Sequence, residues 1–128
     1  MWLISGGAYQ GKLHYALMLT GRKEKDVADG KDCSIQELLK KPVVNHFHLW
    51  IERMLKEEKD IYSLVNQMIE HNPNIVIIVD ELGCGIVPID PYERIYREVT
   101  GRICCHLAKM AKQVHRVSCG IGMVIKDA

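Results

Sequence analysis

The run Ile75-Val76-Ile77-Ile78-Val79 constrains the fold of this chain more than any other stretch. All five residues are β-branched, and no polar residue alternates with them. A strand with one face in water alternates, whereas a strand covered on both faces does not. Such strands occur in parallel sheets whose helices lie above and below. The sequence therefore predicts a three-layer α/β fold with a mainly parallel sheet.

A shorter apolar strand is predicted from Trp2 to Ser5, directly before a glycine-rich turn. The turn reads G-x-x-x-x-G-K, and a helix is predicted over residues 12–20 with Gly21 as its C-terminal stop. Between a strand and a helix, this pattern is typical of a phosphate-binding loop, whose backbone N–H groups and helix N-terminus attract an oxyanion. The alternative is a glycine turn with a solvated lysine. The residues expected to hold phosphate are Gly6, Gly7, Ala8, Tyr9, Gln10, Gly11 and Lys12.

One position in this motif is unusual, because Leu13 stands where the pattern asks for Ser or Thr. The missing hydroxyl normally binds the Mg²⁺ that bridges the terminal phosphates. Leucine cannot bind a metal, so either the metal is held from elsewhere or phosphoryl transfer is impaired.

Asp80-Glu81 follow the apolar run, and aliphatics followed by Asp-Glu are typical of a Walker B strand. We expect Asp80 to bind Mg²⁺ and Glu81 to act catalytically together with Lys12. The carboxyl ends of strands form the ligand crevice in such sheets, which favours this interpretation over acidic residues that merely begin a loop.

The remaining elements are predicted from apolar spacing and from capping residues. Residues 21–33 are charged and predict an exposed loop, and Ser34 is expected to cap a short helix that ends before Pro42. A strand starts at Val43, and the helical pattern begins at His48. Further expected elements are a helix from Ile61 to Asn72, a loop from Leu82 to Ile89, a helix from Asp90 to about Gln113 burying Ile95, Val99, Ile103, Leu107 and Val114, and strands at 117–119 and 123–125.

Composition excludes several classes of function. The net charge is +1, which leaves no broad electrostatic footprint for nucleic acid or an acidic membrane. No apolar run approaches the roughly 20 residues that span a bilayer, and no signal peptide is recognised, so a cytoplasmic single domain over residues 1–128 is expected. The five cysteines include no C-x-x-C and predict free thiols. His46 and His48 are expected on one face of a strand, as a partly exposed pair rather than a metal site.

Five segments together resemble one known family. They are GGAYQGK at 6–12, NHFHLW at 45–50, DELGCGIVP at 80–88, the pair Gly101-Arg102, and VSCGIGMVIK at 117–126. The chain is similar to the bifunctional adenosylcobinamide kinase / adenosylcobinamide-phosphate guanylyltransferase family of cobalamin biosynthesis, as a shortened and divergent member. The resemblance implies a RecA-like P-loop fold, a symmetric homo-oligomer, and binding of GTP or ATP. It also implies phosphorylation of the adenosylcobinamide hydroxyl followed by attachment of GMP.

The departures from this family bear on activity. The family has Ser where this chain has Leu13. The family also has Asp-Cys-Leu-Thr where this chain has Asn45-His46-Phe47-His48. Asp80 stands where the family usually has Asn. The family's guanylylated histidine precedes the middle strand, but this chain has no histidine from Tyr15 to Asn45. A guanylyl intermediate has no evident nucleophile, so guanylyltransferase activity is predicted to be absent.

Three hypotheses for the function follow. The first is that the chain is an enzyme that binds a purine nucleotide and retains cobinamide kinase activity through Lys12, Asp80 and Glu81. It is alternatively a non-catalytic module that binds nucleotide or a corrinoid, as a regulator or assembly partner. The third hypothesis is that the loop binds only a free anion such as phosphate.

Overall fold

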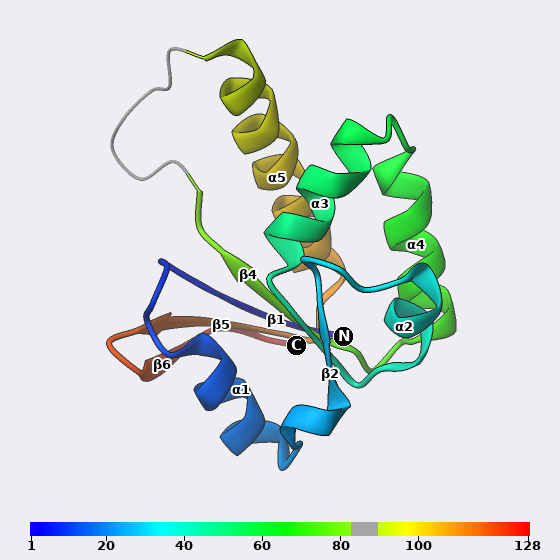
Figure 1. Cartoon of the computed structure of the whole chain (residues 1–128). Helices are drawn as coiled ribbons and strands as arrows, with labels where there is room; N and C mark the ends of the chain where they lie inside the picture. Colours follow the sequence, from blue (N-terminus) through cyan, green and yellow to red (C-terminus); the bar gives the residue numbers. More distant parts are fainter. Residues whose placement is uncertain (83–89) are drawn as a thin grey trace.

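A six-stranded sheet forms the centre of the protein within the residues that the computed structural model describes, 1–82 and 90–128 (Figure 1). Its strand order is β2-β3-β4-β1-β5-β6. The first five strands in this order are parallel, and β6 pairs antiparallel with β5. The strands are β1 (Trp2–Gly6), β2 (Val27–Asp29), β3 (Val43–Asn45), β4 (Val76–Asp80), β5 (Gln113–Ser118) and β6 (Ile121–Asp127).

The helices cover the two faces of the sheet unequally. Helix α1 (Lys12–Thr20) packs on one face, and the other four α-helices of the described residues pack on the opposite face (Figure 1). Those four are α2 (Ile35–Lys40), α3 (Phe47–Lys56), α4 (Ile61–His71) and α5 (Pro91–Met110). This three-layer α/β arrangement with a mainly parallel sheet confirms the predicted fold class.

Strand β4 explains the apolar run that predicted this fold. Val76 and Ile78 pack with Ala16 of α1, while Ile77 and Val79 belong to the larger core under the other helices. All of residues 75–79 are buried. Because both faces of β4 are covered, neither face can carry polar side chains.

The predicted exposed loop at residues 21–33 is only partly correct. It contains a short 3₁₀-helix, η1 (Glu24–Asp26), and then β2, which forms the sheet edge by pairing Val27 with Val43. Ala28 is only 1% exposed. Three residues between charged neighbours are too few to show an alternating hydrophobic pattern. The pairing of this segment with β3 therefore determines that it is a strand.

Several boundaries near the C-terminus also differ from expectation. Helix α5 ends at Met110, and Val114 lies in β5 opposite Leu3 rather than in the helix. Ile95 is 52% exposed, because α5 turns Tyr96, Thr100, Ile103 and Leu107 toward the core. The two final strands are longer than predicted and meet at a tight turn of Cys119 and Gly120, whose φ angles are 52° and 74°. Positive φ at both central residues is the geometry of a type I′ hairpin.

Across the described ranges, no helix combines the length and the apolar composition that crossing a bilayer requires. The predicted loop from Leu82 to Ile89 lies almost entirely outside those ranges, and so does most of the glycine-containing stretch that contributed to the family resemblance.

Candidate phosphate-binding site

The site lies where the carboxyl ends of β1, β3 and β4 meet the N-terminus of α1. A cavity of about 390 Å³ opens there. Parallel strands direct their carboxyl ends to one edge of the sheet, so three segments distant in sequence converge. The described lining residues are Ala8, Tyr9, Gln10, Gly11, Lys12, Leu13, His14, Asn45, His46, His48, Leu49 and Asp80.

Two glycines shape the loop between β1 and α1. A Cβ atom on Gly6 would overlap the carbonyl oxygen of Val117, so only glycine lets the chain leave the sheet so close to β5. Gly11 has φ +83° and precedes the first residue of α1, a conformation that other residues rarely adopt. The glycines of the G-x-x-x-x-G-K pattern thus have steric reasons in this structure.

Lys12 lies buried on the floor of the cavity and is only 6% exposed. Its ammonium donates a hydrogen bond to the carbonyl oxygen of Gly7 at 2.6 Å and pairs with Oδ1 of Asp80 at 2.6 Å. The alternative of a solvated lysine on a glycine turn is therefore wrong. The structure thus brings together two of the predicted site residues: Lys12, which begins α1, and Asp80, which ends β4.

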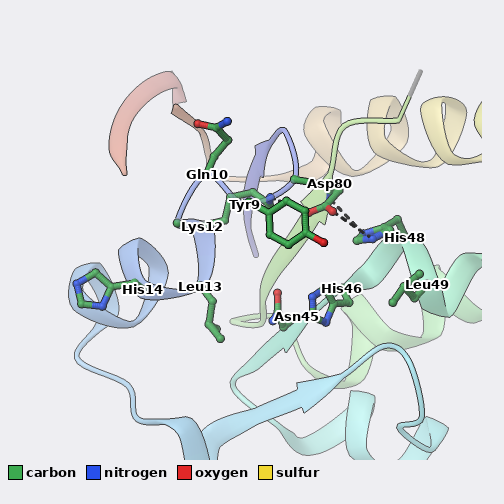
Figure 2. A pocket seen from close by; sticks show the side chains of 12 residues that line it. Tyr9, Gln10, Lys12, Leu13, His14, Asn45, His46, His48, Leu49 and Asp80 are labelled. Atoms are coloured by element: carbon green, nitrogen blue, oxygen red, sulfur yellow. Dashed lines mark hydrogen bonds and ion pairs between the residues drawn. The ribbon is translucent and has the colours of Figure 1, made fainter. Parts of the chain in front are cut away.

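His48 completes this cluster from the first turn of α3. The backbone N–H of Asp80 donates to its Nδ1 at 3.1 Å, and its Nε2 lies 3.4 Å from Oδ2 of Asp80 (Figure 2). Because Nδ1 accepts a backbone hydrogen bond, the neutral ring carries its proton on Nε2, facing the carboxylate. Burial lowers the pKa of His48 and so favours this neutral form. Asp80 is thus held by a lysine and a histidine.

The predicted placement of the two histidines is wrong. They do not share a strand face, because β3 ends at Asn45 and His46 takes a left-handed conformation (φ 54°) that starts α3. His48 is 6% exposed rather than partly exposed. His46 bonds Asp29 through Nδ1 at 3.1 Å. Sequence analysis missed the role of His48, although a histidine within the otherwise apolar Phe47–Ile51 segment was an available signal.

Glu81 is paired with Arg116 of β5. Its carboxylate accepts two hydrogen bonds from the Arg116 guanidinium, at 2.8 and 3.0 Å, and these bonds lower the pKa of Glu81. Glu81 does not line the cavity described above. Its predicted catalytic role is therefore not supported by a position beside Lys12. Arg116, on β5, was not recognised from the sequence.

Gln10 anchors the loop to the β5–β6 turn. Its side-chain Oε1 accepts the Cys119 N–H at 2.6 Å, and its backbone oxygen accepts the Gly120 N–H at 2.8 Å. Figure 2 shows this side chain directed to the turn, away from Asp80. The loop therefore has a fixed position relative to the sheet edge.

The cavity lining fits Mg²⁺ poorly. Leu13 presents a hydrocarbon chain, and Asp80 is the only carboxylate among the described lining residues. That carboxylate is already paired with Lys12 and faces His48. Among the described residues, no group of three His, Cys, Asp or Glu side chains is arranged to hold a metal. A metal at Asp80 stays a prediction that requires Lys12 to leave the carboxylate.

Comparisons with known proteins agree with the family named from the motifs. A family model described as cobinamide kinase / cobinamide phosphate guanyltransferase matches residues 31–125. The bifunctional adenosylcobalamin biosynthesis protein CobU of Escherichia coli (strain K12) is 36% identical over 67 residues, covering 52% of this chain and 37% of that protein. The protein of the same name from Salmonella typhimurium (strain LT2) is 40% identical over 52 residues, covering 41% and 29%.

The matches cover part of each relative and part of this chain. The aligned regions cover less than half of either relative. The family model begins after the glycine loop, so the assignment of residues 6–12 rests on their sequence pattern and their geometry. The match over residues 31–125 nevertheless takes in most of the 128 residues, and the chain therefore belongs to the cobinamide kinase / cobinamide phosphate guanyltransferase family.

Proposed function

We propose that this chain binds GTP or ATP through the loop at residues 6–12 and does not transfer GMP. The observation that carries the proposal is the buried ammonium of Lys12 at the base of this loop. A buried cation beside a helix N-terminus is a strong attractor for a phosphate group. The family to which the chain belongs supports a nucleotide as the source of that phosphate.

The loop backbone supports the same proposal. Within the described part of the chain, the N–H groups of residues 7–10 donate no hydrogen bonds. Gln10 nevertheless holds the loop in place by accepting bonds from the β5–β6 turn. Preorganised donors bind an anion without the entropic cost of ordering the loop at that moment. Lys12 then exchanges its contact with Asp80 for a contact with phosphate.

The positions and contacts of the histidines support the proposed absence of GMP transfer. No histidine lies from Tyr15 to Asn45, where the family resemblance expects the nucleophile. His48 has both ring nitrogens engaged by Asp80, and His46 has Nδ1 engaged by Asp29. To test this, the protein is incubated with radiolabelled GTP and separated under denaturing, alkaline conditions that preserve phosphoramidates. We expect no label on the protein; label that disappears in His14→Asn or in His46→Asn would overturn this part of the proposal.

Phosphoryl transfer to cobinamide is the second candidate function. It is favoured by the placement of Lys12 and Asp80 at the edge where a nucleotide γ-phosphate would lie. Against it stand Leu13 and Asn45, which leave fewer metal ligands than the family pattern has. Without transfer, the protein would act by binding nucleotide or a corrinoid, as a regulator or an assembly partner.

One experiment separates these functions. GTP and ATP are titrated calorimetrically with and without Mg²⁺, and phosphate transfer to cobinamide is then assayed. We expect binding that depends little on Mg²⁺. The absence of nucleotide binding, with inorganic phosphate still bound, would leave only the anion-site hypothesis. Measured transfer would establish the kinase function, whereas its absence at saturating nucleotide would leave the binding function.

We also propose that the protein is a homo-oligomer that uses β6. This edge strand exposes Ile121, Met123, Val124 and Ile125, each more than half exposed. Exposed apolar edge strands are templates for pairing with another chain, and an antiparallel edge can pair with its own symmetry copy. The oligomer implied by the family resemblance would bury this surface.

A further inference from the structure

A hydrogen-bonded pair of side chains, His46 and Asp29, lies at the phosphate-binding cavity. The Nδ1 atom of His46 is 3.1 Å from Oδ1 of Asp29, and His46 is among the residues that line the cavity. The pair joins the last residue of β2 to the residue that precedes α3. The side chains of His46 and Asp29 are 42% and 46% exposed, so water from solvent reaches both of them.

The carboxylate determines which nitrogen of His46 carries the proton. An ionised carboxylate only accepts hydrogen bonds, so Nδ1 donates, and the neutral ring keeps its lone pair on Nε2. Burial opposes the effect, but hydrogen bonds from the Lys31 N–H and from His46 lower the pKa of Asp29. Within residues 1–82 and 90–128, Nε2 has no hydrogen-bond partner, and it is not enclosed by protein atoms. His46 therefore presents a free basic nitrogen.

The surrounding backbone holds this pair in place. His46 has φ 54°, a left-handed conformation that is uncommon for residues other than glycine. Gly30 packs against this bend, because a Cβ atom on Gly30 would overlap the carbonyl oxygen of His46. The Gly30 N–H donates to the Asn45 carbonyl oxygen at 2.7 Å, and Arg53 donates to the Gly30 carbonyl oxygen at 3.0 Å. Backbone strain that is held in this way clusters at functional sites.

A series of contacts connects the pair with Lys12. The ring centroids of His46 and His48 are 5.9 Å apart. Nε2 of His48 lies 3.4 Å from Asp80, and Asp80 in turn pairs with Lys12. Figure 2 shows His46 beside Asn45, on the β3–α3 side of the cavity. The cavity of about 390 Å³ has room for a phosphate group on Lys12 and for a water molecule, which fills about 30 Å³ in the liquid.

We propose that His46 is the general base for hydrolysis of the terminal phosphate of a bound nucleoside triphosphate. This inference rests on the proposed binding of GTP or ATP by residues 6–12. Nε2 of His46 takes a proton from a water molecule, and the oxygen of this water attacks the terminal phosphorus. The bond from that phosphorus to its bridging oxygen breaks, and the electron pair leaves with the nucleoside diphosphate. Asp29 stabilises the imidazolium, which then releases its proton to solvent.

The first measurement needs no nucleotide. Nitrogen NMR shifts of the imidazole rings report which nitrogen carries the proton in the neutral form. We expect the proton on Nδ1 of His46 and a bare Nε2. His48 should show the opposite tautomer, because its Nδ1 accepts a backbone N–H. A proton on Nε2 of neutral His46 would overturn the inference.

The second measurement is the release of inorganic phosphate from saturating GTP with Mg²⁺, in water enriched in a heavy oxygen isotope. We expect release, with the heavy oxygen in the phosphate and none in GDP. His46→Gln should lower the rate about 100-fold, as expected for loss of a general base, and leave GTP affinity unchanged in calorimetry. Asp29→Asn should lower the rate about ten-fold, because the imidazolium loses its counterion.

His71→Gln is the matched control for these variants. Nδ1 of His71 also bonds an oxygen atom, the Gln67 carbonyl at 2.9 Å, but His71 lies on the exposed surface of α4. This variant should keep the wild-type rate. If His46→Gln does not fold, the rate of Asp29→Asn and the tautomer of His46 still test the inference.

The rate should also fall at acidic pH, where His46 gains a second proton, and His46→Gln should lose this dependence. Among the described residues, Asp29 of β2 and His48 of α3 are the titratable groups in contact with His46.

The remaining outcomes separate this inference from the function on which it rests. GTP binding without phosphate release would overturn the inference and leave the proposed nucleotide binding intact, whereas the absence of GTP binding would overturn both. Equal rates in His46→Gln and the wild type would show that His46 is not the base. A covalent label that depends on His46 would show a nucleophile instead and would also overturn the inference.

Discussion

The Nζ atom of Lys12 lies 2.6 Å from Oδ1 of Asp80. The two residues are far apart in the sequence, because β2 and β3 lie between them. The lysine is 6% exposed and the aspartate 21%. Pairing neutralises a cation that burial would otherwise make costly. The same pairing places the ammonium at the loop, where we propose that a phosphate replaces the carboxylate as its partner.

Replacing Asp80 by Asn should lower the stability of the protein and tighten its binding of nucleotide. The variant leaves the Lys12 ammonium buried without a counterion, so we expect the free energy of unfolding to fall by about 1–3 kcal/mol. Nucleotide binding without Mg²⁺ should become tighter, because a negative charge beside the phosphates is removed. Urea unfolding and calorimetry measure the two effects. Glu98→Gln, which breaks the exposed pair with Arg102, should change neither.

Leu13→Ser restores the hydroxyl that the loop pattern lacks. If the cavity is otherwise intact, we expect nucleotide binding to become stronger in the presence of Mg²⁺ than in its absence. Leu19→Ser, at an exposed position of the same helix, controls for the effect of the substitution on α1. Equal Mg²⁺ dependence in Leu13→Ser and in the wild type would contradict the placement of a metal beside this residue.

Gln10→Ala removes the side-chain acceptor that binds the Cys119 N–H. We expect a loss of about 1 kcal/mol in stability, the usual contribution of one hydrogen bond. Nucleotide affinity should also decrease, because the loop must then be ordered on binding. The exposed Gln36→Ala on α2 is the control. Unchanged affinity in Gln10→Ala would show that the turn does not support the loop.

His115 should make stability depend on pH. Its Nδ1 lies 2.7 Å from the Tyr15 hydroxyl, its side chain is 2% exposed, and burial lowers the pKa of its imidazole. The unfolded chain therefore binds more protons than the folded protein as pH falls below about 6.5, so stability decreases in that window. Urea midpoints measured across this range should show the decrease. A profile unchanged by His115→Gln would rule out this histidine as its cause.

Met123→Lys introduces a charge into the exposed apolar surface of β6. If β6 pairs with a second copy, we expect the variant to dissociate into monomers, because two desolvated lysines would oppose pairing. Light scattering coupled to gel filtration measures the mass. Met18→Lys alters an exposed methionine of α1 and should keep the wild-type mass. A monomeric wild type would contradict the proposed oligomer.

Local sequence patterns predicted the elements that have strong periodicity or a steric requirement. The non-alternating residues 75–79 predicted a strand covered on both faces, and β4 is such a strand. The capping roles of Ser34 and Asp90 were also predicted, and both side chains accept a hydrogen bond from the first turn of their helices. Gly6 and Gly11 identified the loop because a Cβ atom at Gly6 would overlap Val117 and because Gly11 has a positive φ that other residues rarely adopt.

The sequence by itself determined the fold class, because hydrophobic periodicity acts over a few neighbouring residues. Five short motifs indicated the family by resemblance, and the glycine pattern predicted the loop that we propose to hold phosphate. Only the tertiary structure decided which groups meet there. It paired Lys12 with Asp80, turned Glu81 toward Arg116, and brought His48 onto the Asp80 backbone. It also paired Val27–Asp29 with β3 as a strand, although no sequence pattern predicts a strand there. These outcomes depend on strand order and on the exit angle of each strand, which no local pattern encodes.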